Sequence, residues 1–320
     1  MISKIKNKIN SFIKQQDILT ESNYKIVSEL HDAKILFSKL LINDIQKRGL
    51  VTNLQETEFK VFSQFGDDGI IQYLIHNVEI KNKTFIEFGV ENYTESNTRF
   101  LLLNNNWKGL VMDGNMKNIE QIRNEGLYWR HDLKAVCNFI KRENINQLFV
   151  ENGFEGEVGI LSIDLDGNDY WIWEAIDVVS PTIVIIEYNS VLGAEFPISI
   201  PYDENFIRSK AHYSYLYWGA SLAALNHLAI KKGYKFVGSN SAGNNAYFVK
   251  QNKVGNLKTL TSEEGYVESH TRESRDKDGN LNFCGTQRKI YKFFGIICHR
   301  PSFFQHSLCD IKARDFIVTM

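Results

Sequence analysis

The sequence predicts an α/β protein with a mixed seven-stranded sheet, made of five parallel strands and a C-terminal antiparallel hairpin. Short apolar runs alternate with stretches long enough for helices, which indicates βαβ units and therefore parallel strands. The last two apolar runs are separated only by the Asn/Gly-rich residues 240–244, which is typical of a hairpin. With 320 residues, of which 43% are apolar, the chain can cover such a sheet on both faces.

Helices are expected before the first strand. Residues 24–48 have helical periodicity and end in a basic turn followed by Gly49, and residues 67–77 form a second such pattern. Residues 1–16 place apolar side chains at helical spacing between lysines. Such a helix either lies on an anionic membrane surface or packs on its own domain or a second subunit. We favour packing, because five apolar positions without a Trp anchor contribute little membrane-binding energy.

The sheet and its covering helices follow in order. The five parallel strands are predicted at 84–88, 109–113, 134–139, 158–163 and 182–187. The connecting helices are predicted at 97–106, 116–125, 143–152 and 169–178. A helix at 219–232 precedes the hairpin strands, 234–239 and 245–250. We therefore divide the chain into an N-terminal helical segment, a core and a C-terminal extension with expected substrate or dimer contacts: 1–58, 59–250 and 251–320. Within the core, the irregular insert 190–215 is long enough to form a lid.

Composition excludes several classes of function. The formal net charge is −1, without the basic excess that a nucleic-acid-binding protein usually shows. The cysteines lack Cys-x-x-Cys spacing, so we expect reduced thiols in a cytoplasmic protein and no zinc cluster. They are Cys137, Cys284, Cys298 and Cys309. No apolar run is long enough to span a membrane.

An ordered set of short motifs resembles the class I S-adenosylmethionine-dependent methyltransferases, and more narrowly the FkbM-like methyltransferases. The motifs are Ser-Gln-Phe-Gly-Asp-Asp at 63–68, Phe-Ile-Glu-Phe-Gly at 85–89, Glu-Ser-Asn-Thr at 95–98, Trp-Lys-Gly-Leu-Val-Met-Asp-Gly at 107–114, Ser-Ile-Asp-Leu-Asp-Gly-Asn-Asp-Tyr-Trp at 162–171 and Ile-Glu-Tyr-Asn at 186–189. The class typically has a Gly-rich loop after its first strand, whereas here Gly89 is followed by Val-Glu-Asn-Tyr. Side chains are therefore expected to replace part of the usual backbone cradle.

The resemblance implies S-adenosylmethionine as cofactor and a Rossmann-like methyltransferase fold. Its methionine end would lie near Glu87 and Gly89, with Gln64 and Asp67 holding the ammonium and carboxylate. Asp113, at the end of the second strand, suits a ribose diol, although an Asp-Gly-Asn sequence can equally cap a turn. The complete set of expected cofactor residues is Gln64, Asp67, Glu87, Gly89, Ser96, Asn97, Asp113, Gly114, Asn138 and Asp164.

Acidic residues gather after the fourth and fifth strands. Oxygen ligands from adjacent strand ends can hold a divalent cation, so Asp164, Asp166 and Glu187 are candidate Mg²⁺ ligands. The alternative is structural, with Asp166 in the turn and Asp169 at the start of the following helix. Methyl transfer to oxygen requires a base for the hydroxyl proton, and the candidates are Asp166, Asp169 and His212.

The sequence therefore predicts an O-methyltransferase that acts on a sugar or nucleotide-sugar hydroxyl, in the pathways of surface or capsule polysaccharide that the resemblance implies. No nucleic-acid partner is expected, and a homo-oligomer is compatible with the sequence. Two alternatives are open. An NAD-dependent nucleotide-sugar oxidoreductase is disfavoured by the hairpin and by the missing Gly-x-Gly-x-x-Gly motif. A non-catalytic binding module is compatible with the Gly-poor loop.

Overall fold

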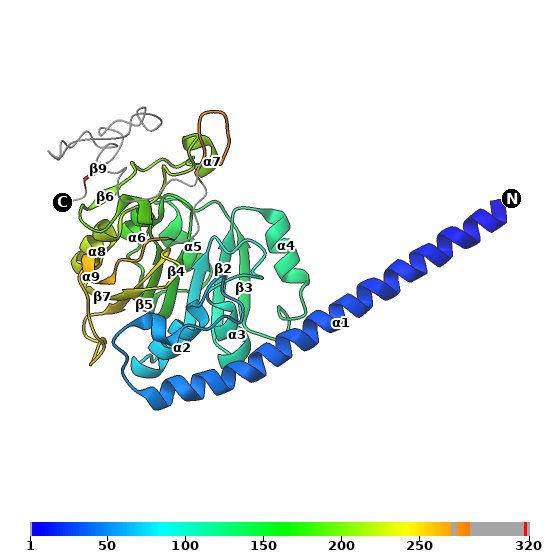
Figure 1. Ribbon diagram of the computed structural model, residues 1–320, viewed down its shortest axis with the longest axis horizontal. Helices are drawn as coiled ribbons and strands as arrows, with labels where there is room; N and C mark the ends of the chain where they lie inside the picture. The colour runs from blue at the N-terminus through cyan, green and yellow to red at the C-terminus, as the bar shows by residue number, and fades with distance from the viewer. Residues whose placement is uncertain (1, 270–273, 282–316, 319–320) are drawn as a thin grey trace.

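A long helix projects from a three-layer body in which helices cover both faces of one sheet (Figure 1). The computed structural model describes residues 2–269, 274–281 and 317–318. The side chains of residues 2–13 and most of the predicted C-terminal extension beyond residue 281 lie outside this description.

The main sheet has seven strands in the order β3-β2-β1-β4-β5-β8-β7. Its strands are β1 (Thr84–Phe88), β2 (Lys108–Asp113), β3 (Leu133–Cys137), β4 (Gly156–Ile163), β5 (Val179–Glu187), β7 (Tyr234–Ser239) and β8 (Asn245–Lys250). β1 to β5 pair in parallel, and β8 pairs antiparallel with both β5 and β7. This arrangement confirms the predicted Rossmann-like methyltransferase fold. The strand order reverses between β1 and β4, which is where ligands bind in open α/β sheets.

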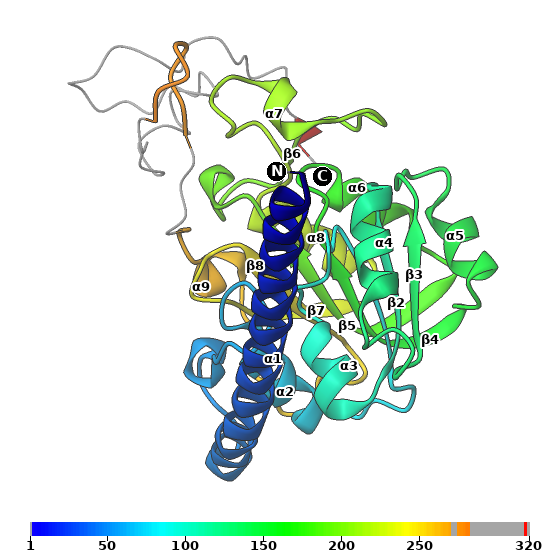
Figure 2. The same cartoon turned by 90° about the vertical axis from the view of Figure 1, so that its right-hand side faces the viewer.

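Each face of the sheet carries its own apolar core. Successive strand residues point to opposite faces, so Phe85 packs in one core and Ile86 in the other. The end of α1 (Ile2–Arg48) and three helices cover the first face: α2 (Asp67–Asn77), α3 (Arg99–Asn105) and α4 (Met116–Asn124). The second face is covered by α5 (Ile145–Glu151), α6 (Asp169–Ala175) and α8 (Leu222–Lys231) (Figure 2). Because both faces are covered, polar side chains reach a ligand only at the ends of the strands.

The N-terminal region differs from its prediction. The sequence predicts helices at 1–16 and 24–48, whereas α1 is continuous from Ile2 to Arg48. Residues 17–23 contain neither Pro nor Gly, so nothing there interrupts the backbone hydrogen bonds. Among the side chains that the structure describes in α1, contacts with the body begin at His31, and Ile35 and Ile42 contact the small apolar core of Val61, Phe62 and Phe100.

The insert after β5 contains short elements that the sequence did not predict. η2 (Ser190–Leu192), β6 (Ile198–Ser199) and α7 (Arg208–Ala211) lie within it, and β6 pairs antiparallel with β9 (Ile317–Val318). Two further short helices, η1 (Leu54–Thr57) and α9 (Ser262–Gly265), flank the core. Within the described part of the chain, no helix combines the length and apolarity needed to cross a bilayer.

Candidate active site

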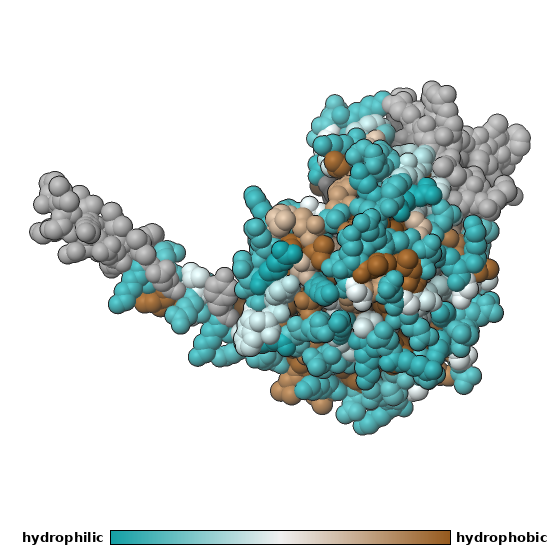
Figure 3. Space-filling view, turned by 180° about the vertical axis from the view of Figure 1, so that it is seen from behind, coloured by the Kyte–Doolittle hydropathy of each residue, from teal (hydrophilic) through white to brown (hydrophobic). Residues whose placement is uncertain are grey.

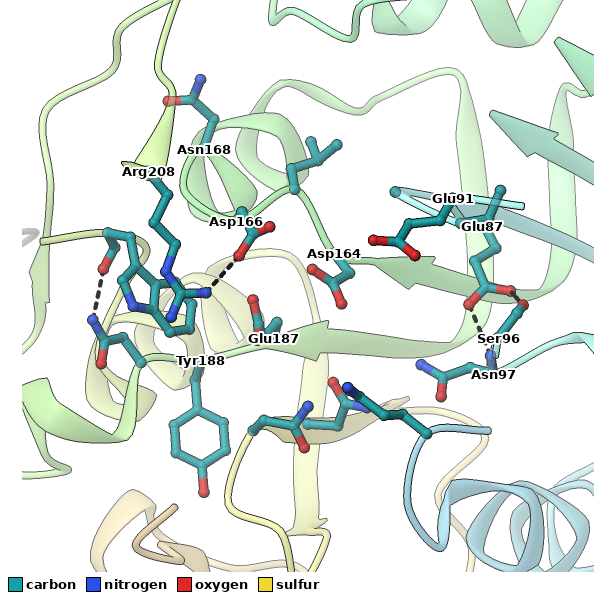
Figure 4. A pocket seen from close by; sticks show the side chains of 18 of the residues that line it. Glu87, Glu91, Ser96, Asn97, Asp164, Asp166, Asn168, Glu187, Tyr188 and Arg208 are labelled. Carbon is teal, nitrogen blue, oxygen red and sulfur yellow. Dashed lines mark hydrogen bonds and ion pairs between the residues drawn. The ribbon is translucent and has the colours of Figure 1, made fainter. Parts of the chain in front are cut away.

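A cavity of about 530 Å³ lies over the carboxyl ends of β1, β2, β4 and β5 (Figure 4). Nine of the ten predicted cofactor residues line it; Asp67 does not. One end is built by residues after β1 and β2, and we call it the β1–β2 end: Glu87, Gly89, Glu91, Ser96, Asn97 and Asp113. The other lies under the insert, and we call it the insert end: Phe206, Arg208, Leu216 and Trp218.

Gly89 brings the turn after β1 against the end of β4. It has φ +78°, and a Cβ there would lie 1.6 Å from the Asp164 carbonyl oxygen. Its N–H donates to the Met112 carbonyl of β2 at 3.0 Å. Only glycine fits this position, although the rest of the turn is poor in glycine.

Glu87 organises the loop that follows this turn. Its buried carboxylate accepts hydrogen bonds from the Ser96 and Thr98 hydroxyls and from the Asn97 and Thr98 N–H groups, at 2.9 Å and 3.0 Å for the latter two. Burial raises the pKa of Glu87, whereas these hydrogen bonds lower it. Since its oxygens are already occupied by the loop, Glu87 shapes the cavity wall and holds Asn97 in place.

Asp113 carries out the turn-capping role that the sequence left open. One carboxylate oxygen accepts from the Asn115 N–H at 2.7 Å and from the Asn118 amide at 3.1 Å, and the other accepts from the Glu91 N–H at 2.9 Å. A carboxylate has about four acceptor sites, so roughly one remains free. With these contacts kept, Asp113 can accept one hydrogen bond from a ribose rather than the two of a bidentate contact.

Asp67 is placed differently from its prediction. It is fully buried at the start of α2, and its Oδ1 accepts hydrogen bonds from Asn240 and Asn245 at 3.0 Å and 2.9 Å and a shorter one from the Tyr247 hydroxyl. These partners belong to the hairpin of β7 and β8, more than 170 residues away. Asp67 therefore ties α2 to the hairpin and does not face the cavity. Gln64, predicted with it, does line the cavity.

The insert docks on the turn between β4 and α6. Arg208 pairs with Asp166 at 2.6 Å, and its guanidinium lies 4.4 Å from the ring centroid of Trp218. Phe206 lies directly over Gly167, where a Cβ would come within 2.3 Å of its ring. The Asn168 amide also donates to the Asp203 carbonyl at 2.8 Å. The insert therefore forms a wall of the cavity, and Gly167 is required for this close approach.

Asp164 and Glu187 face one another at the junction of the two ends (Figure 4). Burial raises the pKa of each carboxyl well above its ordinary value. Repulsion by neighbouring carboxylates raises both further, with Asp164 acting on Glu187 and Asp169 and Asp166 acting on Asp164. Among the described groups, the Glu187 Oε2 atom accepts no N–H or O–H bond. Each of the two carboxyls therefore binds a proton more readily than an ordinary Asp or Glu side chain does.

The three predicted bases are all engaged elsewhere. Asp166 is exposed and paired with Arg208. Asp169 is fully buried outside the cavity lining, and its carboxylate accepts from the Leu165 N–H at 2.7 Å and from the Gly167 N–H at 3.0 Å. This is the structural alternative that the sequence left open for Asp169. His212 lies outside the cavity lining, with Nδ1 2.7 Å from the Ser214 hydroxyl.

The predicted magnesium site is not supported by the geometry. In the described ranges, no three His, Cys, Asp or Glu side chains are grouped as a metal site would require. Asp164 and Glu187 do come together, but the third expected ligand, Asp166, turns to Arg208. A basic partner satisfies the Asp166 charge that a cation was expected to neutralise.

The cavity is strongly acidic. Seven of the described residues that line it are acids and only Arg208 is basic; the acids are Glu87, Glu91, Glu95, Asp113, Asp164, Asp166 and Glu187. A concave surface of one charge sign concentrates ligands of the opposite sign. S-adenosylmethionine carries a sulfonium and an ammonium group, so the lining suits this cofactor. Gln64, Asn97 and Asn138 add neutral hydrogen-bonding groups for its carboxylate and its adenosine.

Sequence reasoning missed Glu91, Arg208, Trp218 and the hairpin residues 243–245 as parts of the cavity. Glu91 had a usable signal, because it lies two residues after Gly89 in the same turn. Arg208 and Trp218 had none, since the path of the insert and of the residues that follow it decides which of their side chains reach the cavity.

No protein-family model matches this sequence, and no curated protein is significantly similar to it. Solved structures of methyltransferases are similar in fold at low sequence identity. The N-terminal domain of EvdMO1 with SAH (S-adenosylhomocysteine) bound is 10% identical, with 66% of this chain and 94% of that chain covered and a TM-score of 0.38. A S-adenosylmethionine-dependent methyltransferase from Clostridium acetobutylicum is 9% identical, with 57% and 90% covered and a TM-score of 0.37. TrmK from M. capricolum, also in complex with S-adenosylhomocysteine, is 13% identical, with 58% and 70% covered and a TM-score of 0.31.

Proposed function

We propose that this protein is a S-adenosylmethionine-dependent O-methyltransferase that acts on a hydroxyl group of a sugar or nucleotide-sugar. The observation that carries the proposal is the acidic cavity at the switch point of the sheet, lined by nine of the ten residues expected for that cofactor. The narrower resemblance to FkbM-like enzymes, and with it a role in surface or capsule polysaccharide, belongs to the same proposal.

The two ends of the cavity have separate tasks. The β1–β2 end holds the cofactor, with Asn97 and Gln64 near its methionine part, Asp113 at the ribose and Asn138 toward the base. When bound, the cofactor supplies an electrophilic methyl group. The insert end holds the acceptor, because its aromatic side chains Phe206 and Trp218 offer apolar faces on which a sugar ring can stack.

Asp164 and Glu187 are the proposed proton acceptor for the reacting hydroxyl. Their position at the junction of the two ends supports this role, since the hydroxyl must lie there to approach the methyl group in line. One carboxyl orients the hydroxyl and the pair takes up its proton. Their raised pKa values make each carboxylate a stronger base than an ordinary Asp or Glu. This assignment replaces Asp166, Asp169 and His212 as the base, and it moves Asp164 from the expected cofactor residues to the proton acceptor.

The test is transfer of an isotopically labelled methyl group from S-adenosylmethionine to panels of sugars, nucleotide-sugars and catechols, with and without EDTA. We expect label in a sugar or nucleotide-sugar as a methyl ether, and no change with EDTA. Label in catechols alone would contradict the acceptor class. A protein that binds S-adenosylhomocysteine but methylates none of these panels would contradict the proposed reaction.

A further inference from the structure

The projecting part of α1 is a helix without support from the body. Every side chain that the structure describes between Lys14 and Leu30 is exposed, and contacts with the body begin at His31, whose ring packs edge-on against Phe62. At about 1.5 Å per residue, α1 is roughly 70 Å long, and its N-terminal end lies far from the sheet (Figure 1). A long helix in water is normally stabilised by packing along one face.

The sequence of α1 follows a heptad repeat. Steps of alternately three and four residues from Ile2 to Leu40 define twelve positions of this repeat. Ten of the twelve are apolar. The two exceptions are Gln16 and Asn23. A repeat of 3.5 residues sustained over more than five heptads is the pattern of a left-handed coiled coil.

The repeat does not serve the contact that α1 already makes. Ile35, Ser38, Ile42 and Ile45 face the body. The heptad residues lie on the other side of the helix, and each of the following is at least half exposed: Leu19, Ile26, Leu30, Phe37 and Leu40. Figure 3 shows a hydrophobic patch on the projecting part of α1, bordered by hydrophilic side chains. One face of α1 is therefore occupied by the body, and an opposite apolar stripe is not.

We propose that a second copy of this chain covers this stripe, so that two α1 helices form a parallel coiled coil. The two polar positions support this partner and this orientation. In a parallel pair, Gln16 and Asn23 each meet their own counterpart, and a polar residue at an inner position is known to fix register and two-strandedness. An antiparallel pair with the same overlap would set Leu19 against the Asn23 of the second copy and leave the amide in an apolar layer.

An anionic membrane surface is the competing occupant. A helix lying on a membrane has a broad apolar face and a basic polar face. The exposed acids Glu21, Glu29 and Asp32 lie along the same helix, so its polar side is not uniformly basic. The charge pattern and the heptad spacing both favour pairing of helices.

The test is sedimentation equilibrium of the full chain and two variants. Ile26→Glu places a charge in the stripe, and Ile18→Glu is the matched control, because Ile18 is equally exposed but lies outside the repeat. We expect twice the 37.0 kDa chain mass for the wild type and for Ile18→Glu, and at least a tenfold weaker dimer for Ile26→Glu, with unchanged circular dichroism of the body. A monomeric wild type, or equal masses for the two variants, would overturn the proposal.

Two further measurements separate the alternatives. Asn23→Cys should form a covalent dimer under mild oxidation, because a parallel pair brings the two copies of residue 23 together; Ile18→Cys should not. No cross-link at residue 23 would overturn the parallel arrangement. The wild-type protein should not co-sediment with vesicles of phosphatidylserine and phosphatidylcholine. Co-sedimentation of a monomeric protein would assign the stripe to membrane instead.

Discussion

The β1–β2 end and the insert end of the cavity are built in different ways. The β1–β2 end comes from two consecutive βα turns, and many of its hydrogen bonds, such as the Asp113 bond to the Glu91 N–H, lie within residues 84–118. The insert end depends on contacts between distant segments, such as Arg208 with Asp166. The first end belongs to the sheet and its turns, whereas the second is carried by a segment with little regular structure. This difference suits a fixed cofactor and a variable acceptor.

The strongest way to break the β1–β2 end is to fill the space at Gly89. Gly89→Ala should abolish S-adenosylhomocysteine binding and lower the unfolding free energy by about 3 kcal/mol or more, because its Cβ would overlap the Asp164 carbonyl. Calorimetry and urea unfolding measure the two effects. Gly153→Ala is the matched control, since Gly153 has φ +80° but no atom within 3.8 Å of the added Cβ. Gly153→Ala should lower the unfolding free energy by only about 1–2 kcal/mol, which is the usual strain of a non-glycine residue in the left-handed region. Equal losses in both variants would show that the close approach is unimportant.

At the junction of the two ends, Asp164→Asn should lower turnover by about 10²- to 10⁴-fold and leave S-adenosylhomocysteine affinity nearly unchanged. The reason is that the proposed proton acceptor would be lost while the cofactor contacts remain. Asp166→Asn is the control, because Asp166 is exposed and paired with Arg208. We expect the turnover of Asp166→Asn to change by less than about tenfold. Wild-type turnover should also rise with pH, since a raised pKa keeps the pair protonated at lower pH. A larger loss in Asp166→Asn than in Asp164→Asn would refute the assignment.

The buried Asp169 sharpens the contrast with Asp164, because its role is structural. Burial raises its pKa from 3.8 to about 6, so the folded protein binds this proton more tightly than the unfolded chain does. The unfolding free energy should therefore decrease as pH rises from about 4 to about 6, by on the order of 3 kcal/mol from this group, and level off above. Asp68, whose pKa burial also raises to about 6, contributes in the same window.

Urea unfolding of the wild type and of Asp169→Asn between pH 4 and pH 7 isolates the contribution of Asp169. The difference in unfolding free energy between the two proteins should shrink as pH rises through this range, while the contribution of Asp68 cancels. A difference that does not depend on pH would mean that Asp169 titrates at its ordinary pKa.

The smallest expected effects separate binding at the two ends. Asp113→Asn should weaken S-adenosylhomocysteine binding by about 10- to 100-fold, the value of one charge-assisted hydrogen bond, with acceptor KM unchanged. Arg208→Gln should leave that binding unchanged and raise the acceptor KM several-fold, because the insert would lose its anchor on Asp166. The opposite pattern in the two variants would mean that the ends are assigned the wrong way round.

Local patterns in the sequence predict most of the fold. The boundaries of α2, β1, β7 and β8 agree with the prediction, because each apolar run is bounded by turn residues that act locally. Helices at 1–16 and 24–48 were predicted where α1 is continuous, and residues 17–23 contain neither Pro nor Gly to separate them. The elements of the insert were missed because pairs such as β6 with β9 join segments more than 100 residues apart.

The site was predictable to the same extent. Residues at strand ends, such as Gly89 and Asp113, line the cavity because the fold itself brings strand ends together, and their roles toward a cofactor stay predictions. Asp67 was misplaced, because its hydrogen bonds to Asn240 and Asn245 depend on how the hairpin packs against α2. The choice among the carboxylates of residues 164–169 depended on which oxygens accept backbone N–H bonds, and sequence spacing does not contain that information.

The most direct test of the central claim is calorimetric titration of the wild-type protein with S-adenosylmethionine, S-adenosylhomocysteine and NAD. The acidic cavity over the switch point predicts that the first two bind at one site per chain and that NAD does not, because its pyrophosphate would meet a lining of seven acids. Binding of NAD, or binding of none of the three, would contradict the account.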